Sequence, residues 1–360
     1  MGEFYCPVRI FTGPGALDAL SRWRVSRALL VTDRFFSESG VARMVAEKLG
    51  DAQVEIFDRV KPDPPAALAA EGAALCHRFR PELLIALGGG SPLDCAKAIR
   101  LAAESPLEFV AIPTTSGSGA EMTSFSILSH GGVKHALVDP ALRPDAAILD
   151  PSLLERLPVS LIADTGMDLA AHCLEAAVAA GRTGFTSALA AHALRTALTC
   201  LEPSFRGDGS VRLRLHEAAA MAGMAFDSAG LGVLHAVAHA LGGAFPVPHG
   251  RLCAMLIPPV MAANLPAALE SYAALARACG IEAAAGRLAV RSLSQQLERL
   301  RRSLRLPSNF AEAGLRREEF EAKRPALVEA ALADPCGRTN PVPVTRDLVE
   351  RILQDRKSVV

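Results

Sequence analysis

The spacing of apolar residues divides the chain into two parts with different periodicity. From Arg27 to Asp150, short runs rich in Val, Ile, Leu and Phe alternate with longer alanine-rich stretches. This alternation is typical of βαβ units around a parallel sheet. The expected strands are Ala28 to Thr32, Val54 to Phe57, Leu83 to Leu87 and Phe109 to Ile112, and the expected helices are Val41 to Leu49, Ala66 to Phe79 and Leu93 to Ala103. We therefore predict a doubly wound sheet for this part.

After Asp150 the pattern becomes that of helices. Alanine and leucine dominate, and clusters of β-branched residues become rare. Helices are expected at Ala163 to Ala180, Ala188 to Leu201 and Leu213 to Phe226. Pro158 marks the boundary, because proline favours the start or the end of a helix. We therefore predict an α/β domain over residues 1–157 and an all-helical domain over residues 158–360.

Composition narrows the range of partners. Half of the 360 residues are apolar, and 38 basic residues balance 38 acidic ones. This balance argues against nucleic acid or an anionic membrane surface as the partner and favours a small molecule. The cysteines are scattered without a C-x-x-C pair, as expected for reduced thiols in a cytoplasmic protein. No signal-peptide pattern and no membrane span of ~18 uninterrupted apolar residues is found, so a soluble protein is expected.

A glycine-rich turn follows the third predicted strand, in the segment LLIALGGGSPLDCAK. Gly88, Gly89 and Gly90 let backbone N–H groups approach a ligand without a Cβ atom in the way. Ser91 is predicted to be the N-cap of the next helix, whose dipole favours an anion such as a pyrophosphate. Because the segment is not the G-x-G-x-x-G fingerprint, a simple tight turn remains the alternative.

A second candidate loop, IPTTSGSGAEMT, follows the next strand. Its residues Thr114, Thr115, Ser116 and Ser118 offer hydroxyl groups to phosphate or ribose oxygens. Two such loops at adjacent strand ends predict a dinucleotide crevice in a Rossmann-like sheet. Asp33 ends an earlier strand, where its carboxylate would bind the ribose 2′-OH and repel a 2′-phosphate. This favours NAD(H) over NADP(H), although a plain turn aspartate explains Asp33 equally well.

Titratable residues recur at helical spacing in the second part. Asp168 and His172 are four residues apart in TGMDLAAHCLEA, so a helix would place both on one face. His235 and His239 are also four apart, on an apolar helix that is expected to break at the following glycine pair. His249 is then expected on a loop. Several buried imidazoles without partners are costly, and one zinc or ferrous ion would satisfy them together. Spacing alone leaves all of these residues as candidate ligands.

The motifs carry a resemblance to a known family. GGGSPLDCAKAI, PTTSGSGAEMTS, DTGMDLAAHCLEA and GLGVLHAVAHALGGAFPVPHG resemble the signatures of the iron-containing (group III) alcohol dehydrogenases. The match covers nearly the whole chain and includes DPCGRTNPVPVT near its C-terminal end. The sequence as a whole is similar to those of the propanol dehydrogenases of bacterial microcompartments. The resemblance implies the fold shared by dehydroquinate synthases and iron alcohol dehydrogenases, with a dinucleotide-binding domain followed by a metal-binding and substrate domain.

The resemblance also implies roles for individual residues. It assigns a divalent metal, Fe(II) in preference to Zn(II), to Asp168, His172, His235 and His249, and it places His239 beside the metal as a proton relay. It assigns the cofactor NAD(H) to Asp33, Gly90, Ser91, Asp94, Thr114, Thr115, Ser118 and Lys134. Asp63 stands where many relatives have asparagine, and Phe125 replaces a polar residue found in some.

The activity implied by the resemblance is the reversible, NAD(H)-linked reduction of a short-chain aldehyde, such as propionaldehyde or acetaldehyde, to the primary alcohol. A homodimer is implied, in the cytoplasm or in a microcompartment lumen beside other microcompartment enzymes. Alternatives are a lyase of the dehydroquinate synthase type, a polyol dehydrogenase of the glycerol type, and a non-catalytic metal-binding shell partner. The lyase would need basic groups for a substrate phosphate, and few lie near the predicted ligands in sequence.

Overall fold

The computed structural model describes residues 2–105, 107–131 and 133–355. Its contacts divide the chain into two compact units, one from Cys6 to Leu157 and one from Pro158 onward. The short segment before Cys6 belongs to the second unit, where the Phe4 ring stacks on Phe185 at a centroid distance of 5.6 Å. The prediction had given this segment to the α/β domain. A residue pattern does not reveal such a stacking contact between distant segments.

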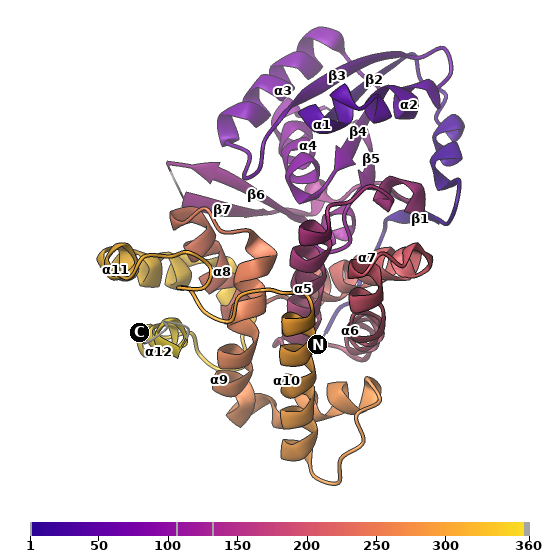
Figure 1. The fold of residues 1–360 in the computed structure, drawn as a ribbon. Helices are drawn as coiled ribbons and strands as arrows, with labels where there is room; N and C mark the ends of the chain where they lie inside the picture. The colour runs from indigo at the N-terminus through magenta and orange to yellow at the C-terminus, as the bar shows by residue number, and fades with distance from the viewer. Residues whose placement is uncertain (1, 106, 132, 356–360) are drawn as a thin grey trace. The chain divides into compact units, whose positions relative to one another are not determined.

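A parallel sheet is the centre of the unit from Cys6 to Leu157, and it confirms the predicted fold class (Figure 1). Its order is β1-β8-β5-β4-β2-β3. The strands are β1 (Arg9–Thr12), β2 (Arg27–Asp33), β3 (Gln53–Val60), β4 (Leu83–Gly88), β5 (Glu108–Pro113) and β8 (Ala146–Leu149). Because β2 lies between β3 and β4, the direction of winding reverses between β2 and β4. Ligands of open α/β sheets bind at the carboxyl ends of the strands at such a point.

Alternation along the strands explains why helices cover both faces of this sheet. Leu29 and Leu84 belong to an apolar core on the side of α3 (Ala66–Phe79) and α4 (Gly90–Ala103). Leu30 and Ile85 belong to the opposite core. That second core also contains residues of η1 (Ala16–Arg22), α1 (Arg34–Glu38) and α2 (Val41–Glu47). Strands buried on both faces read as continuous apolar runs, which is why they were recognisable in the sequence.

The pattern of apolar runs in the sequence did not predict four of the strands that the structure describes. The β1 and β8 strands span 4 residues each, too few for a clear apolar run. The strands β6 (Phe125–His130) and β7 (Val133–Val138) pair with each other in an antiparallel hairpin separate from the main sheet. Lys134 lies on this hairpin.

The second unit is helical. Its α-helices are α5 (Val159–Ala176), α6 (Gly184–Phe205), α7 (Arg212–Ala229), α8 (Val233–Ala244), α9 (His249–Ala278), α10 (Gly286–Ser303), α11 (Arg317–Ala333) and α12 (Arg346–Asp355). By length and composition α9 would qualify as a membrane span, but 61% of its apolar window is buried inside the protein. Core packing therefore accounts for its apolar character.

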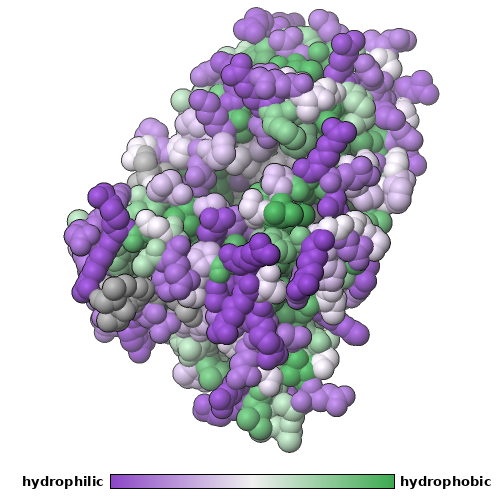
Figure 2. All heavy atoms as spheres, viewed as in Figure 1, coloured by the Kyte–Doolittle hydropathy of each residue, from purple (hydrophilic) through white to green (hydrophobic). Residues whose placement is uncertain are grey.

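On the face shown in Figure 2, hydrophilic side chains predominate and apolar atoms form separate patches.

Candidate functional site

Three helices of the second unit each contribute two candidate side chains. In every pair the residues are four positions apart, so both side chains lie on one face of their helix. The pairs are Asp168 and His172 on α5, His235 and His239 on α8, and His249 and Cys253 on α9. All except the partly exposed His249 are buried. The helical spacing that was read from the sequence is thus present, and α9 adds a cysteine that the sequence reading missed.

Two local predictions about this region were wrong. The α8 helix continues through Gly242 and Gly243 to Ala244 instead of breaking at the glycine pair. His249 is the first residue of α9 and not a loop residue. Glycine disfavours a helix by only about 1 kcal/mol, and packing of α8 against α9 and α11 can outweigh that preference.

The donor atoms of the candidate ligands converge on Asp168. Its Oδ1 atom lies 3.5 Å from Nε2 of His249, 3.6 Å from Nε2 of His235 and 3.5 Å from Sγ of Cys253. The donor atoms of these residues all lie within 4.8 Å of one another. One small cation could therefore contact several of them at once.

His172 lies at the margin of this group. Its Nδ1 atom is 3.9 Å from Oδ1 of Asp168. Its ring stacks on His235 and on Phe226 of α7, with a centroid distance of 4.4 Å in each case. The structure thus brings all four predicted ligands together, with His172 held between two other rings.

The chemistry of this donor set fits a divalent metal ion. Two nitrogen or oxygen ligands about 2.1 Å from a tetrahedral ion lie about 3.4 Å apart, which is close to the separations measured around Asp168. Within the described part of the chain, the buried Nε2 atom of His235 makes no hydrogen bond. A buried polar atom in this state costs free energy unless a ligand satisfies it.

The charges of His235 and Asp168 stabilise each other. Burial alone would lower the pKa of His235, but the neighbouring carboxylates of Asp168 and Glu175 raise that pKa to about 9. Burial alone would raise the pKa of Asp168, but the surrounding imidazoles hold it well below its usual value. The site therefore stabilises positive charge on His235 beside the ionised carboxylate of Asp168.

His239 lies beside the donor group rather than within it. Its ring stacks on that of His249 at a centroid distance of 5.3 Å, and its Nδ1 atom lies 2.8 Å from Oδ2 of Asp334. The other carboxylate oxygen of Asp334 accepts a hydrogen bond of 2.8 Å from the backbone N–H of Cys336. Asp334 was not recognised in the sequence, because it lies 95 positions from His239 and no local spacing connects the two.

In the α/β unit, the glycine turn and the hydroxyl-rich loop lie side by side. They follow the neighbouring strands β4 and β5. A Cβ atom on Gly89 would lie 3.4 Å from the side chain of Thr115, and one on Gly90 would lie 3.4 Å from that of Ser118. At Gly88, φ is +148° and a Cβ atom would lie 2.5 Å from Pro92, so glycine is required there. The two loops form one small, glycine-lined surface.

The prediction that Ser91 caps α4 was wrong. The N-cap is Gly89, and Ser91 lies in the first turn of the helix. The backbone N–H of Thr114 donates a hydrogen bond of 2.9 Å to the carbonyl of Gly88, which links the two loops. On α4, burial raises the pKa of Asp94 to about 7, against the lowering effect of neighbouring lysine charges.

Asp33 and Lys134 both have protein partners. Oδ1 of Asp33 accepts a hydrogen bond of 3.1 Å from the N–H of Phe36 and caps α1, as the turn-aspartate alternative implied. Nζ of Lys134 lies 2.5 Å from Oδ1 of Asp63. Asp63 has a φ of 55°, a left-handed conformation that aspartate and asparagine tolerate better than most residues.

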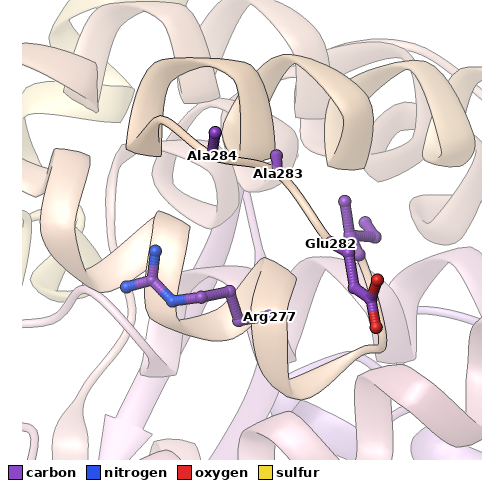
Figure 3. A pocket seen from close by; sticks show the side chains of 5 residues that line it. Arg277, Glu282, Ala283 and Ala284 are labelled. Carbon is purple, nitrogen blue, oxygen red and sulfur yellow. The ribbon is translucent and has the colours of Figure 1, made fainter.

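A surface depression lies near the end of α9. It is lined by Arg277, Ile281, Glu282, Ala283 and Ala284 (Figure 3). None of these residues is among the predicted site residues, and we assign the depression no function.

Comparison with known proteins decides the family. Residues 7–151 match the model of iron-containing alcohol dehydrogenases, and residues 162–356 match the model of the C-terminal part of the Fe-containing alcohol dehydrogenase family. The chain belongs to the iron-containing alcohol dehydrogenases. As a member of this family it is an NAD-dependent alcohol oxidoreductase that works with a metal ion, and the resemblance read from its motifs is confirmed.

Individual relatives of this alcohol dehydrogenase cover its full length. The 1-propanol dehydrogenase of Salmonella typhimurium is 38% identical over 368 residues, covering 99% of this chain and 100% of the relative. The NADPH-dependent butanol dehydrogenase of Clostridium saccharobutylicum is 33% identical over 378 residues, covering 98% and 97%. The iron-containing alcohol dehydrogenase structure from Thermococcus thioreducens has a TM-score of 0.92 and 29% identity, covering 99% and 100%.

Proposed function

We propose that this enzyme reversibly reduces short-chain aldehydes to primary alcohols with NADH, using one divalent metal ion held by Asp168, His172, His235 and His249. The observation that carries the proposal is the convergence of these side chains from three helices, with donor separations that fit a metal ion. Family resemblance favours Fe(II), and Zn(II) suits the same ligands.

The bound metal would supply Lewis-acid chemistry that polarises the oxygen of the substrate. The protein positions a proton carrier beside it. A carboxylate can only accept a hydrogen bond, so Asp334 keeps the proton of His239 on Nδ1. Nε2 of the neutral ring then carries a lone pair that can take the proton of an alcohol, and the reverse transfer serves aldehyde reduction.

The nicotinamide cofactor is assigned to the carboxyl ends of β2, β4 and β5. Gly88, Gly89, Gly90 and Ser91, at the start of α4, offer close backbone approach for the pyrophosphate. Thr114, Thr115 and Ser118 offer hydroxyl groups beside it. We assign Asp33 to the adenosine ribose, Lys134 to the nicotinamide ribose, and Asp94 to the same cofactor site.

The substrate is proposed to be a short, unbranched aldehyde. The named relatives act on propanol and butanol, and the apolar side chains Leu241 and Phe245 on and after α8 are buried. The family resemblance also supports a homodimer in the cytoplasm or a microcompartment lumen. The mass of the purified protein in solution would test the dimer.

To test the function, the protein is loaded anaerobically with Fe(II) or with Zn(II). The loss of NADH absorbance is then measured with acetaldehyde and with propionaldehyde as substrate. Turnover with at least one metal is expected, and no turnover with either would contradict the proposal. Glycerol, used in the direction of oxidation, tests the polyol alternative.

His235→Ala separates a catalytic metal site from a structural one. We expect activity to be lost with little unfolding, whereas collapse of the fold would indicate that the metal is structural. His192→Ala, at an exposed position on α6, is the matched control and should retain activity.

A further inference from the structure

Cys253 lies among the candidate metal ligands. Its side chain is fully buried, and its Sγ atom is 3.5 Å from Oδ1 of Asp168 and 3.5 Å from Nε2 of His249. We propose that Cys253 is an additional, sulfur ligand of the metal ion. This inference rests on the metal site of the proposed function and deepens it, because it adds a soft donor to a set of aspartate and histidine ligands.

The separations around Sγ fit this role. A sulfur ligand lies about 2.3 Å from zinc, and a nitrogen or oxygen ligand about 2.1 Å, so at the angles of about 90–120° found in a five-coordinate ion the two donors are about 3.1–3.8 Å apart. Both measured separations from Sγ are 3.5 Å. The sulfur atom is thus as well placed as the nitrogen atoms of His235 and His249 relative to Asp168.

A second observation points to a ligand at the same place. The buried Nε2 of His235 faces Asp168 at 3.6 Å and makes no hydrogen bond within the described part of the chain. His235 is only 1% exposed. A cation that satisfies this nitrogen beside Asp168 would therefore lie among the donors that include Cys253.

The α9 helix fixes the sulfur in this position. Cys253 follows His249 by one helical turn, so both side chains leave the same face of the helix. Other buried cysteines lie elsewhere: Cys336 groups with His239 and Asp334, and Cys200 on α6 lies in neither group of candidate donors, whereas Cys253 lies with Asp168, His235 and His249.

A thiolate ligand would change which metal the site prefers. Soft sulfur donors favour zinc over ferrous iron when compared with oxygen donors. Binding releases the thiol proton to solvent, as for any cysteine ligand. We therefore expect the site to discriminate in favour of Zn(II) more strongly than the aspartate and histidine ligands alone would do.

Substitution with Co(II) tests this role, because cobalt bound to sulfur gives a near-ultraviolet charge-transfer band, while its visible ligand-field bands report binding to any donors. The wild-type protein should show both kinds of band. Cys253→Ser should keep the visible bands and lose the charge-transfer band. It should also lower the affinity for Zn(II) by at least about tenfold, since loss of even an outer partner of a ligand costs about 10–100-fold.

The serine variant retains a group that can donate to Asp168, so the test separates a ligand from a simple hydrogen-bond donor. Cys200→Ser, at another buried cysteine of the same unit, is the control and should leave the spectrum unchanged. Visible bands without a charge-transfer band in the wild-type protein would overturn the sulfur ligand alone. The absence of all cobalt bands would overturn the metal site of the proposed function itself.

Discussion

Oε2 of Glu175 lies 2.6 Å from Nδ1 of His235, and both residues are almost fully buried. Oε1 of the same carboxylate accepts a hydrogen bond of 2.7 Å from the backbone N–H of Leu234, which fixes its orientation. When His235 is neutral, a carboxylate at Nδ1 keeps the ring proton there and leaves the lone pair of Nε2 for the metal. Glu175 is therefore a positioning residue for His235.

Glu175→Gln should lower the affinity for the metal by about 10–100-fold, because the amide is a weaker hydrogen-bond acceptor and carries no charge. Competition with a chelator measures this affinity directly. Glu270→Gln, at an exposed position on α9, is the control and should bind the metal as the wild-type protein does. Equal affinity in the two variants would show that Glu175 does not support the ligand.

Asp33 allows the charge at the proposed ribose site to be changed without loss of the helix cap. Asp33→Asn retains a side-chain oxygen that can accept the hydrogen bond from Phe36, and asparagine is as good an N-cap as aspartate. Removal of the negative charge should relieve the repulsion of a 2′-phosphate. We expect the ratio of kcat/KM for NADPH to that for NADH to rise by roughly tenfold, equivalent to about 1.4 kcal/mol.

The control for this experiment is Asp51→Asn, at an exposed turn position in the same unit. It changes the net charge of the protein by the same amount. If both variants shift the coenzyme ratio equally, the effect comes from overall charge, and the assignment of Asp33 to the ribose is wrong.

The proposed proton carrier predicts a graded loss of rate. His239→Asn should lower kcat by about 100-fold or more, the lower range for loss of a general acid or base. Asp334→Asn should lower kcat less, because His239 remains but its tautomer is no longer fixed. Steady-state rates over a range of pH, with metal content measured in parallel, check this order. Metal loss that accounts for the lost rate in either variant would contradict the relay.

How much of this site could be predicted from the sequence depends on how far apart in the chain the contacting residues lie. Asp168 with His172 and His235 with His239 were recognisable, because one helical turn connects each pair. The two pairs lie on helices that are far apart in the chain. Local spacing does not predict that these helices pack together around Asp168. The ligand set came from family resemblance.

The residues that were missed show the same limit. Cys253 lies one turn after His249, but His249 had been placed on a loop, so no helical face was expected there. Glu175 contacts a residue 60 positions away and Asp334 one 95 positions away. The strands β2 and β4 were predictable because burial on both faces makes them continuously apolar, whereas β1 and β8 are too short for that signal.

Gly250, next to His249 at the start of α9, packs so closely against α5 that the structure leaves no room for a side chain. A Cβ atom at this position would lie 1.8 Å from the backbone oxygen of Asp164 on α5, so the first turn of α9 would have to move. Gly250→Ala should destabilise the protein by about 1–3 kcal/mol or more, as overpacking does, and should weaken metal binding. Gly184→Ala is the matched control at the first turn of α6, where nothing lies within 4 Å of the added atom. Equal thermal stability of the two variants would contradict the packing argument.

Glu121 predicts a pH-dependent stability that is independent of the metal site. The residue is 1% exposed, and burial raises the pKa of its carboxyl group from 4.5 to about 7. Because the folded protein holds this proton more tightly than the unfolded chain, ionisation of Glu121 costs stability as the pH rises from 4.5 towards 7. A shift of this size corresponds to roughly 3 kcal/mol at pH values above both pKa values.

Glu121→Gln removes the ionisation while keeping the shape of the side chain. The stability of the variant relative to the wild-type protein should therefore increase by roughly 3 kcal/mol as the pH rises from mildly acidic to mildly alkaline values. Denaturant unfolding of both proteins across this range measures the difference. Glu55→Gln, at an exposed position on β3, should show no comparable pH-dependent gain, since solvent hydrates its charge in both states. A constant difference between wild type and Glu121→Gln across the range would mean that the folded protein stabilises the ionised carboxylate as well as water does.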